Sequence, residues 1–289
     1  MKRIEIRHST RYGFAAPVTL GAHTLLLRPR EGHDLRIASS SLDISPEANV
    51  TWRRDFYDNV LAVANFADGT VTEVSFESRL EVELYEITPL DFVVDPHAVQ
   101  FPIDYSKEEQ TALRPFLETV YDRHDLTDEW IAPYTQMNKG TETFFVLDQM
   151  NHRINEEIVY EERDEPGVLA PETLLEIRKG SCRDMAALFV EACRRLNIAA
   201  RFVSGYVHGP ATEAGGASSH AWAEVYLPGA GWKGFDPTNI AVVGPDHIPV
   251  AVHRHPEKVP PVAGSFTGPN DLVPTLTVDV QIHEILEPV

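Results

Sequence analysis

Residues 179–185 read KGSCRDM, and this stretch decides how the second half of the chain folds. Ser181 is a preferred helix N-cap residue, and the acidic Asp184 follows three positions later, which is a capping-box pattern. The pattern predicts a helix that begins at Cys182 and ends near Leu196. A cysteine in the first turn of a helix lies at the positive end of the helix dipole, which stabilises the thiolate. The sequence therefore predicts a reactive thiol at a helix start.

The first turn of this helix has one favourable and one opposing feature. The backbone N–H of Cys182 has no partner inside the helix, so it can face a developing oxyanion. The carboxylate of Asp184 lies in the same turn and disfavours a second negative charge nearby. A protonated imidazole in contact with the sulfur would outweigh it, so we expect a histidine partner.

Two segments downstream supply an imidazole and a carboxylate. Residues 219–226 read SHAWAEVY and contain His220, and residues 234–238 read GFDPT and contain Asp236. A thiol, an imidazole and a carboxylate in this chain order are the parts of a cysteine nucleophile, its base and the group that orients the base.

Whether His220 and Asp236 meet depends on the turn between them. Residues 228–231 read PGAG and predict a hairpin. If Leu227 faces Gly231, His220 and Asp236 are diagonal neighbours on one face of the sheet. A four-residue loop would shift the register by one and send them to opposite faces. The sequence allows both registers.

Length and charge narrow the function classes. The chain has 289 residues, 43% of them apolar, which is enough for about two domains. The formal net charge of −19 disfavours nucleic-acid binding, which needs a basic surface. No apolar run approaches the ~20 residues that span a bilayer, and the alternating start of the chain is typical of a strand rather than a signal peptide. We expect neither nucleic acid nor membrane as a partner, and a cytoplasmic location.

The chain has two cysteines, Cys182 and Cys193. If both lie on one helix, eleven residues separate them by about 16 Å along its axis, too far for a disulfide. Both are therefore expected to be free thiols, which suits a reducing compartment. Cys193 falls on an apolar stripe of the helix and is expected in the core.

The remaining patterns divide the chain into three parts. Residues 1–87 alternate polar and apolar between turn signals and predict an all-β sandwich. Residues 88–105 contain three prolines and predict a linker or strap. Residues 106–289 predict an α+β domain, with an irregular strap over 253–275. Its expected helices cover 106–123, 141–157, 171–178 and 182–196, and its expected strands cover 201–207, 221–227, 232–235 and 276–282.

Four ordered segments resemble the transglutaminase-like core of the papain-like superfamily: residues 180–184 (GSCRD), 200–206 (ARFVSGY), 219–226 (SHAWAEVY) and 231–239 (GWKGFDPTN). Near the start, residues 8–14 (HSTRYGF) and 26–30 (LLRPR) resemble the β-domain that precedes this core in bacterial members. The resemblance implies a papain-like α+β core, in which the cysteine helix packs on an antiparallel sheet, preceded by an all-β sandwich. Residues 106–289 would be the catalytic domain.

The resemblance also implies roles. Cys182 would be the nucleophile, His220 the general base and Asp236 the orienting carboxylate. The chemistry would be acyl transfer at a peptide or amide carbonyl through a thioester, with water or an amine as the acceptor; hydrolysis is favoured, because excluding water demands a special cleft. The substrate would be a peptide or protein, without an organic cofactor. The chain departs from the family pattern at Ser181, Arg183 and 252–258.

Two alternatives remain for the site. The scaffold can serve as a peptide-binding module without catalysis. Thiolate, imidazole and carboxylate are also zinc ligands, but the sequence offers no fourth ligand at short spacing, so no metal is expected. His253 and His255 could point two imidazoles the same way, although a solvated strap explains them as well.

Three aromatic residues are weaker candidates. Trp222 would share a strand face with His220 and could wall the site from water. Tyr206 and Tyr160 could line the cleft or donate to the oxyanion. Core packing is at least as good an interpretation of each.

Overall fold

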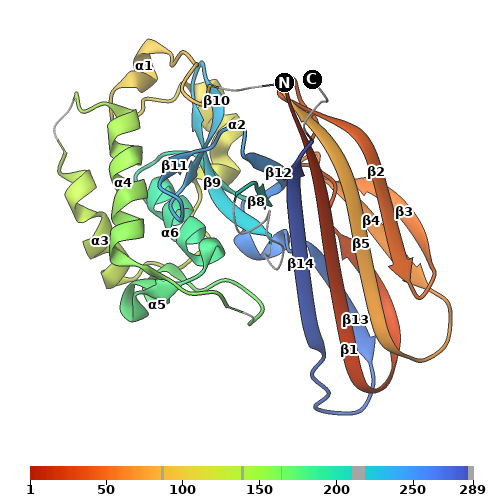
Figure 1. The fold of residues 1–289 in the computed structure, drawn as a ribbon. Helices are drawn as coiled ribbons and strands as arrows, with labels where there is room; N and C mark the ends of the chain where they lie inside the picture. The colour runs from red at the N-terminus through yellow and green to blue at the C-terminus, as the bar shows by residue number, and fades with distance from the viewer. Residues whose placement is uncertain (86–87, 138–139, 164, 210–218, 286–289) are drawn as a thin grey trace.

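The first strand, β1 (Lys2–Leu25), organises the N-terminal part of the computed structural model, which describes residues 1–85, 88–137, 140–163, 165–209 and 219–285. Its first half pairs with β5 (Val71–Leu84) and β14 (Thr275–Glu284). Its second half pairs with β4 (Val60–Phe66) and β13 (Val262–Thr267). One strand thus contributes to both layers of a β-sandwich (Figure 1).

Two further strands complete the layers: β2 (Leu35–Ser45) pairs with β5, and β3 (Ala48–Arg54) pairs with β4. Apolar residues of β1 and β5, among them Phe14, Val74 and Phe76, form a core of the sandwich. This confirms the expected all-β sandwich at the front of the chain. The start of β1 and the end of β14 lie side by side, because Ile4 pairs with Glu284 (Figure 1).

The second part is built on a five-stranded antiparallel sheet in the order β11-β10-β9-β8-β12. The strands are β8 (Ala200–Val207), β9 (His220–Leu227), β10 (Gly231–Asp236), β11 (Ala241–Val242) and β12 (His247–His253). Helix α6 (Cys182–Arg195) packs against β8 and β9. The apolar stripe of α6 forms the larger core with the neighbouring helices, and Cys193 lies fully buried in it as predicted. The expected α+β arrangement, with the cysteine helix on an antiparallel sheet, is confirmed.

The other helices are α1 (Pro96–Val99), α2 (Lys107–Leu117), α3 (Asp125–Thr135), α4 (Thr143–Glu157) and α5 (Pro171–Ile177), and the short elements β6 (Val159–Tyr160), β7 (Lys179–Gly180) and η1 (Pro256–Lys258) complete the order. Helices α2–α5 pack against α6, and α1 packs against α4 (Figure 1). The capping box expected at the start of α2 is present, with Ser106 and Glu109 each accepting from the other's backbone N–H. No helix among the described residues is long and apolar enough to cross a membrane.

The C-terminal strands differ from the expected layout. The segment 253–275 was expected to be irregular, but it contains η1 and the regular strand β13. Both β13 and β14 pair with β1, so the end of the chain returns to the N-terminal sandwich. The boundaries of the three parts stay a prediction, and residue 87, where the first part was expected to end, lies outside the described residues.

The sandwich docks on β12, the outer strand of the second sheet. The backbone N–H of Arg30 donates to the carbonyl oxygen of Pro249 (3.0 Å). The side chain of Asn59 donates to the carbonyl oxygen of Val252 and accepts from its N–H, both at 2.8 Å. These bonds occupy an edge that would otherwise expose unpaired backbone groups. They also fix β12 relative to the sandwich.

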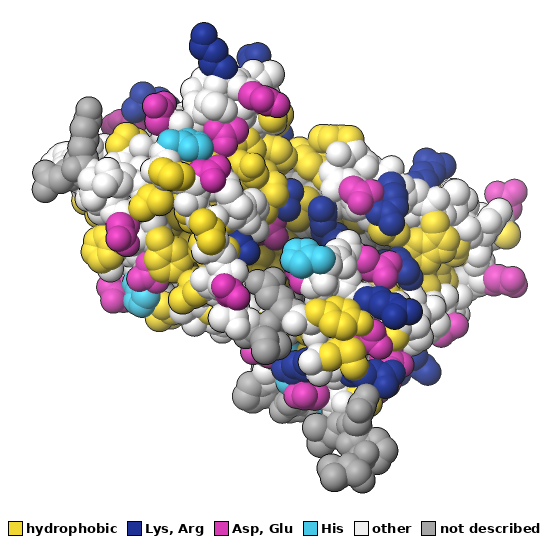
Figure 2. All heavy atoms as spheres, turned by 90° about the horizontal axis from the view of Figure 1, so that it is seen from above, with side chains coloured by type: hydrophobic (Ala, Val, Ile, Leu, Met, Phe, Trp, Pro, Cys, Tyr) yellow, Lys and Arg dark blue, Asp and Glu magenta, His cyan; other side chains and the backbone are white. Residues whose placement is uncertain are grey.

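Seen from above, the molecule carries acidic and basic side chains scattered among apolar and uncharged ones (Figure 2). On this face the acidic side chains are not gathered in one patch.

Candidate active site

Cys182 is the first residue of α6, as the sequence predicted. The backbone N–H and the hydroxyl of Ser181 both donate to Oδ2 of Asp184 at 2.8 Å. This local structure fixes the turn that presents the thiol. Cys182 is partly exposed and Cys193 is buried, and both are free, as expected.

The carboxylate of Asp184, which opposes a thiolate in the same turn, has its charge compensated. Asp184 is fully buried, and the guanidinium of Arg163 donates to both of its oxygens at 2.9 Å. The backbone N–H of Leu169 adds a further bond at 2.8 Å. Arg183, where the chain departs from the family pattern, donates to the carbonyl oxygens of Arg163 and Glu165. Both arginines thus hold the preceding loop against the start of α6.

His220 and Asp236 meet because the hairpin has the productive register. Leu227 pairs with Gly231, which leaves a three-residue loop. His220 lies at the start of β9 and Asp236 at the end of β10, and Nε2 of the imidazole is 2.8 Å from Oδ2 of the carboxylate. His220 is also hydrogen-bonded to Cys182. Because Nε2 is engaged with Asp236, Nδ1 is the nitrogen left for the sulfur.

The electrostatics of His220 favour its protonated form. Burial by itself lowers the pKa of His220, but the hydrogen bonds to Asp236 and Cys182 outweigh it and raise the pKa to about 10. An imidazolium next to a sulfur favours the thiolate. The arrangement can therefore hold a thiolate–imidazolium pair.

Asp236 is fully buried and accepts five hydrogen bonds from residues that the structure describes. Its Oδ1 accepts from the backbone N–H groups of Thr238 (3.0 Å) and Asn239 (3.3 Å). Its Oδ2 accepts from His220 (2.8 Å), His247 (3.0 Å) and the side-chain amide of Asn239 (2.7 Å). Burial raises the pKa of Asp236, but the bonds from the two histidines outweigh it and hold the pKa well below its usual range. The group is an ionised carboxylate at neutral pH.

His247 is the site residue that the sequence did not single out. It is the first residue of β12, eleven positions after Asp236, and it belongs to none of the four family-like segments. Its only local signal is that it opens an alternating strand, which is too common to mark a site. Its contact with Asp236 depends on the tertiary fold, which brings the start of β12 next to the end of β10.

The three aromatic candidates lie in different places. Trp222 is fully buried, with its ring centroid 6.2 Å from that of His220 and 5.2 Å from that of His247. A Cβ at Gly205 would lie 2.6 Å from the Trp222 ring, so glycine is required below it. Trp222 therefore packs beside both imidazoles, and its role as a wall of the site stays a prediction.

The two tyrosines lie on different elements and have different partners. Tyr206 is buried at the junction with the sandwich, where its hydroxyl is 3.0 Å from Nδ1 of His8. Tyr160 is half exposed on β6 and pairs with Gly180, two residues before Cys182. Burial raises the pKa of Tyr160 to about 12, and the charge of Cys182 adds to it. Tyr160 is therefore near the thiol and protonated, whereas the hydroxyl of Tyr206 is engaged by the sandwich.

The structure adds His247 to the residues that could bind zinc. Ligand-type atoms of His220, Asp236 and His247 lie within 4.8 Å of one another. Both imidazoles, however, use the same nitrogen, Nε2, to bind the carboxylate. Hydrogen bonding thus accounts for the short distances between these atoms, and the expectation of no metal stays a prediction.

His253 and His255 were the second pair of histidines that could point the same way. In the structure Nδ1 of each accepts a nearby backbone N–H.

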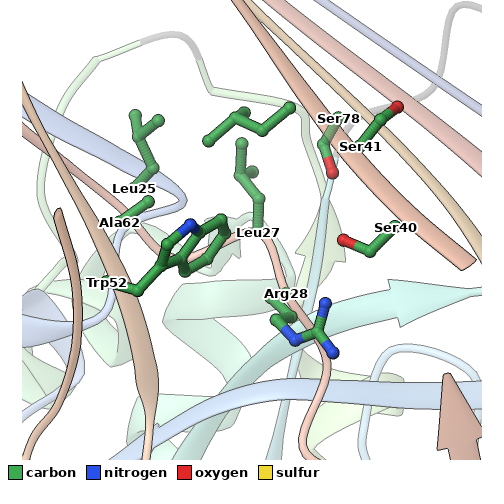
Figure 3. A pocket seen from close by; sticks show the side chains of 9 residues that line it. Leu25, Leu27, Arg28, Ser40, Ser41, Trp52, Ala62 and Ser78 are labelled. Atoms are coloured by element: carbon green, nitrogen blue, oxygen red, sulfur yellow. The ribbon is translucent and has the colours of Figure 1, made fainter. Parts of the chain in front are cut away.

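A small cavity lies away from these residues, inside the sandwich (Figure 3). Its volume is about 10 Å³, room for about one water molecule. Leu25, Leu27, Trp52 and Arg28 are among the side chains around it. It is too small for a substrate.

Comparison with known proteins places the chain in a family. Residues 4–83 match the bacterial transglutaminase-like N-terminal region, and residues 132–237 match the transglutaminase-like superfamily. Uncharacterized proteins of Mycobacterium leprae and Mycobacterium tuberculosis are 25% identical over 285 and 304 residues, which cover 93% and 96% of this chain and 94% and 92% of theirs. The crystal structure of a candidate cysteine protease from Cytophaga hutchinsonii has a TM-score of 0.74 at 18% identity, covers 100% of this chain and 92% of its own, and shows the same fold. The chain therefore belongs to the transglutaminase-like superfamily, in its bacterial form with an N-terminal β-domain.

Proposed function

We propose that this protein is a cysteine-dependent acyl-transfer enzyme that hydrolyses peptide or amide bonds through a thioester on Cys182. The observation that carries the proposal is the continuous chain of contacts from Cys182 to His220 and from His220 to Asp236, the latter at 2.8 Å. Membership of a family of cysteine-dependent enzymes supports the same chemistry.

The reaction follows from these positions. The thiolate of Cys182 attacks the carbonyl carbon, and the N–H at the start of α6 is available to the developing oxyanion. The imidazolium of His220 gives its Nδ1 proton to the departing amine, which leaves a thioester. Neutral His220 then takes a proton from water as the water attacks the thioester, and the acid and the thiolate are released. Asp236 keeps its charge throughout and holds His220 through Nε2.

Water is the proposed acceptor because Cys182 retains exposed surface and His220 lies beside it. An amine that reached the thioester first would make the protein a transglutaminase instead. The proposed substrate is a peptide or protein, and neither nucleic acid nor membrane is a proposed partner. The two free thiols support a reducing compartment, and we propose the cytoplasm.

The first test is alkylation by iodoacetamide, with mass spectrometry separating the two cysteines. Cys182 is expected to react fast even at about pH 6, as thiolates paired with an imidazolium do. Cys193 serves as the internal control, because burial raises the pKa of its thiol. Equal, slow labelling of both cysteines would contradict the proposal and favour a binding module that lacks the chemistry.

The second test identifies the acceptor. Wild-type protein and Cys182→Ala are incubated with a peptide library, with and without a labelled primary amine. New carboxyl ends that depend on Cys182 are the expected result. Incorporation of the amine in place of water would leave the thioester mechanism intact and change the reaction to transamidation.

A further inference from the structure

His247 lies on β12 and contacts Asp236, but the proposed mechanism gives it no role. Its Nε2 lies 3.0 Å from Oδ2 of Asp236, the same oxygen that holds His220. Both His247 and Asp236 are buried. Because His247 and His220 bind the same oxygen of Asp236, His247 can affect how Asp236 orients His220.

The hydrogen bond to Asp236 defines the role of one nitrogen of His247. An oxygen of an ionised carboxylate only accepts, so Nε2 must carry the proton of this bond. The other nitrogen, Nδ1, is buried and has no hydrogen-bond partner among the described residues. The bond to Asp236 is therefore the one hydrogen bond through which the imidazole of His247 is held among these residues.

The N-terminal sandwich holds the strand that carries His247. Lys2 of β1 pairs with Asp246, the residue before His247, at 2.7 Å. Arg30 bonds to Pro249 through the backbone, and Asn59 bonds to Val252. The contacts follow β12 along its length. Because β12 also pairs with β8, beginning at His247 itself, the position of His247 is set by the core sheet and the sandwich together.

We propose that His247 is a positioning residue: its imidazole, placed on β12 beside the N-terminal β-domain, donates to Asp236 and holds the carboxylate in the orientation that aligns His220 with Cys182. This inference rests on the proposed function. The catalytic roles of Cys182, His220 and Asp236 stay as proposed above. It assigns to the β-domain a part in building the site.

The effect of losing His247 follows from the hydrogen bonds that remain. Without it, Oδ2 of Asp236 keeps only His220 and the amide of Asn239 from the side chains described. The carboxylate is then less constrained, and His220 receives a larger share of its charge. The groups that face His220 are Cys182 from α6, Asp236 from β10 and Asn239 after it. A change at His247 therefore reaches the thiol through His220.

The experiment compares His247→Leu with His247→Gln, whose amide N–H can replace the Nε2–H donor. His253→Leu on the same strand is the matched control, because His253 contacts Tyr57 rather than Asp236. We expect His247→Leu to lower kcat on the peptide substrates by about 10- to 100-fold, with little change in KM. The reason is that His247 orients Asp236 and does not itself contact the substrate. His247→Gln is expected to recover most of this loss, and His253→Leu to retain wild-type kcat.

Two readouts separate positioning from simple destabilisation. Nitrogen-15 NMR of the wild-type imidazoles at neutral pH is expected to show a proton on Nε2 of His247. The pH dependence of Cys182 alkylation is expected to shift in His247→Leu and not in His253→Leu, at temperatures where both remain folded.

Each outcome has a separate meaning. If wild-type Cys182 is unreactive and no peptide is cut, the proposed function fails and the NMR result alone decides the tautomer. If the wild type is active and His247→Leu keeps both its kcat and its alkylation profile, the positioning role is wrong. A His247→Gln protein as impaired as His247→Leu would also overturn it, because the donor would then be irrelevant.

Discussion

Asp236 determines the geometry of the site because all of its hydrogen-bonding capacity is used. Its two oxygens accept five bonds from described residues on β9, β12 and the turn after β10. A buried carboxylate with this many donors cannot rotate without leaving several of them unsatisfied. His220 is therefore held by a group that is itself held.

This arrangement gives Asp236→Asn two effects. An amide N–H₂ replaces one acceptor oxygen, so donors on one side of the group face another donor. We expect kcat to fall by about 10²- to 10⁴-fold as the base loses its orientation. We also expect the free energy of unfolding to fall by about 1–3 kcal/mol from the unsatisfied donors. Steady-state kinetics and urea denaturation measure the two effects. Asp58→Asn, at an exposed position, is the control; unaltered activity in Asp236→Asn would remove Asp236 from the mechanism.

The sequence predicted the residues of the site unequally. Cys182, His220 and Asp236 lie in short segments with strong local patterns, and the structure brings them together. His247 enters through a contact between segments that no local pattern encodes. Asn239 lies in the family-like segment 231–239, only three residues after Asp236, but its side chain was not singled out. The hairpin register was left open because one residue in a turn decides it, and only packing selects the productive alternative.

At the scale of the element, the start of α6 is organised around a buried ion pair. Asp184 has no exposed surface and Arg163 only 18%, so neither charge is well solvated. The pair also ties the loop before α5 to the turn that presents Cys182. Removal of one partner of this pair should therefore cost more stability than removal of one partner of an exposed ion pair.

Arg163→Met tests this element. It leaves the Asp184 carboxylate buried without its cation, and removal of one partner of a buried pair costs about 3–5 kcal/mol. We expect a loss at the lower end of that range, because Arg163 is partly exposed, together with slower alkylation of Cys182. Urea denaturation measures the loss. Lys179→Met removes an exposed ion pair with Glu161 in the same region and is expected to change stability little. Equal stability of the two variants would contradict the role of Arg163.

Four helices were predicted with starts within two residues of the observed ones. The capping boxes at Ser106 and Ser181 mark the starts of α2 and α6, although α2 ends at Leu117 rather than near residue 123. Helix α3 was missed, because its N-cap is His124, an uncommon N-cap residue, and it contains Pro133. Strand β13 was missed because its partner, β1, lies more than 230 residues earlier in the chain, and its own residues show little alternation.

At the scale of the whole molecule, β1 connects the two parts. The start of β1 pairs with β14. Ile4 and Ile6 of β1 pack on the core domain in an apolar cluster that includes Tyr206. The sandwich also occupies the open edge of β12. Residues at this junction therefore contribute both to stability and to the position of the site.

His8 makes the junction sensitive to acid. It is buried, with Nδ1 bonded to Tyr206 and Nε2 to Thr10, at 3.0 and 2.9 Å. Burial lowers the pKa of His8 to about 4, while the charge of Asp279 on β14 opposes this. The folded protein therefore keeps His8 neutral at pH values where the unfolded chain, with a pKa near 6.5, takes up a proton.

The free energy of unfolding should consequently be highest above pH 6.5 and fall as the pH drops toward 4. Below that value both states bind the proton, so the loss levels off at about 3 kcal/mol for this residue. Urea denaturation of the wild type and His8→Leu at pH 7.5, 5.5 and 4.5 isolates the contribution, because the other histidines titrate in both proteins. The wild type is expected to lose more stability than His8→Leu over this range. Parallel losses in the two proteins would show that His8 binds its proton in the folded state as readily as in the unfolded one, and that the junction does not depend on its neutral form.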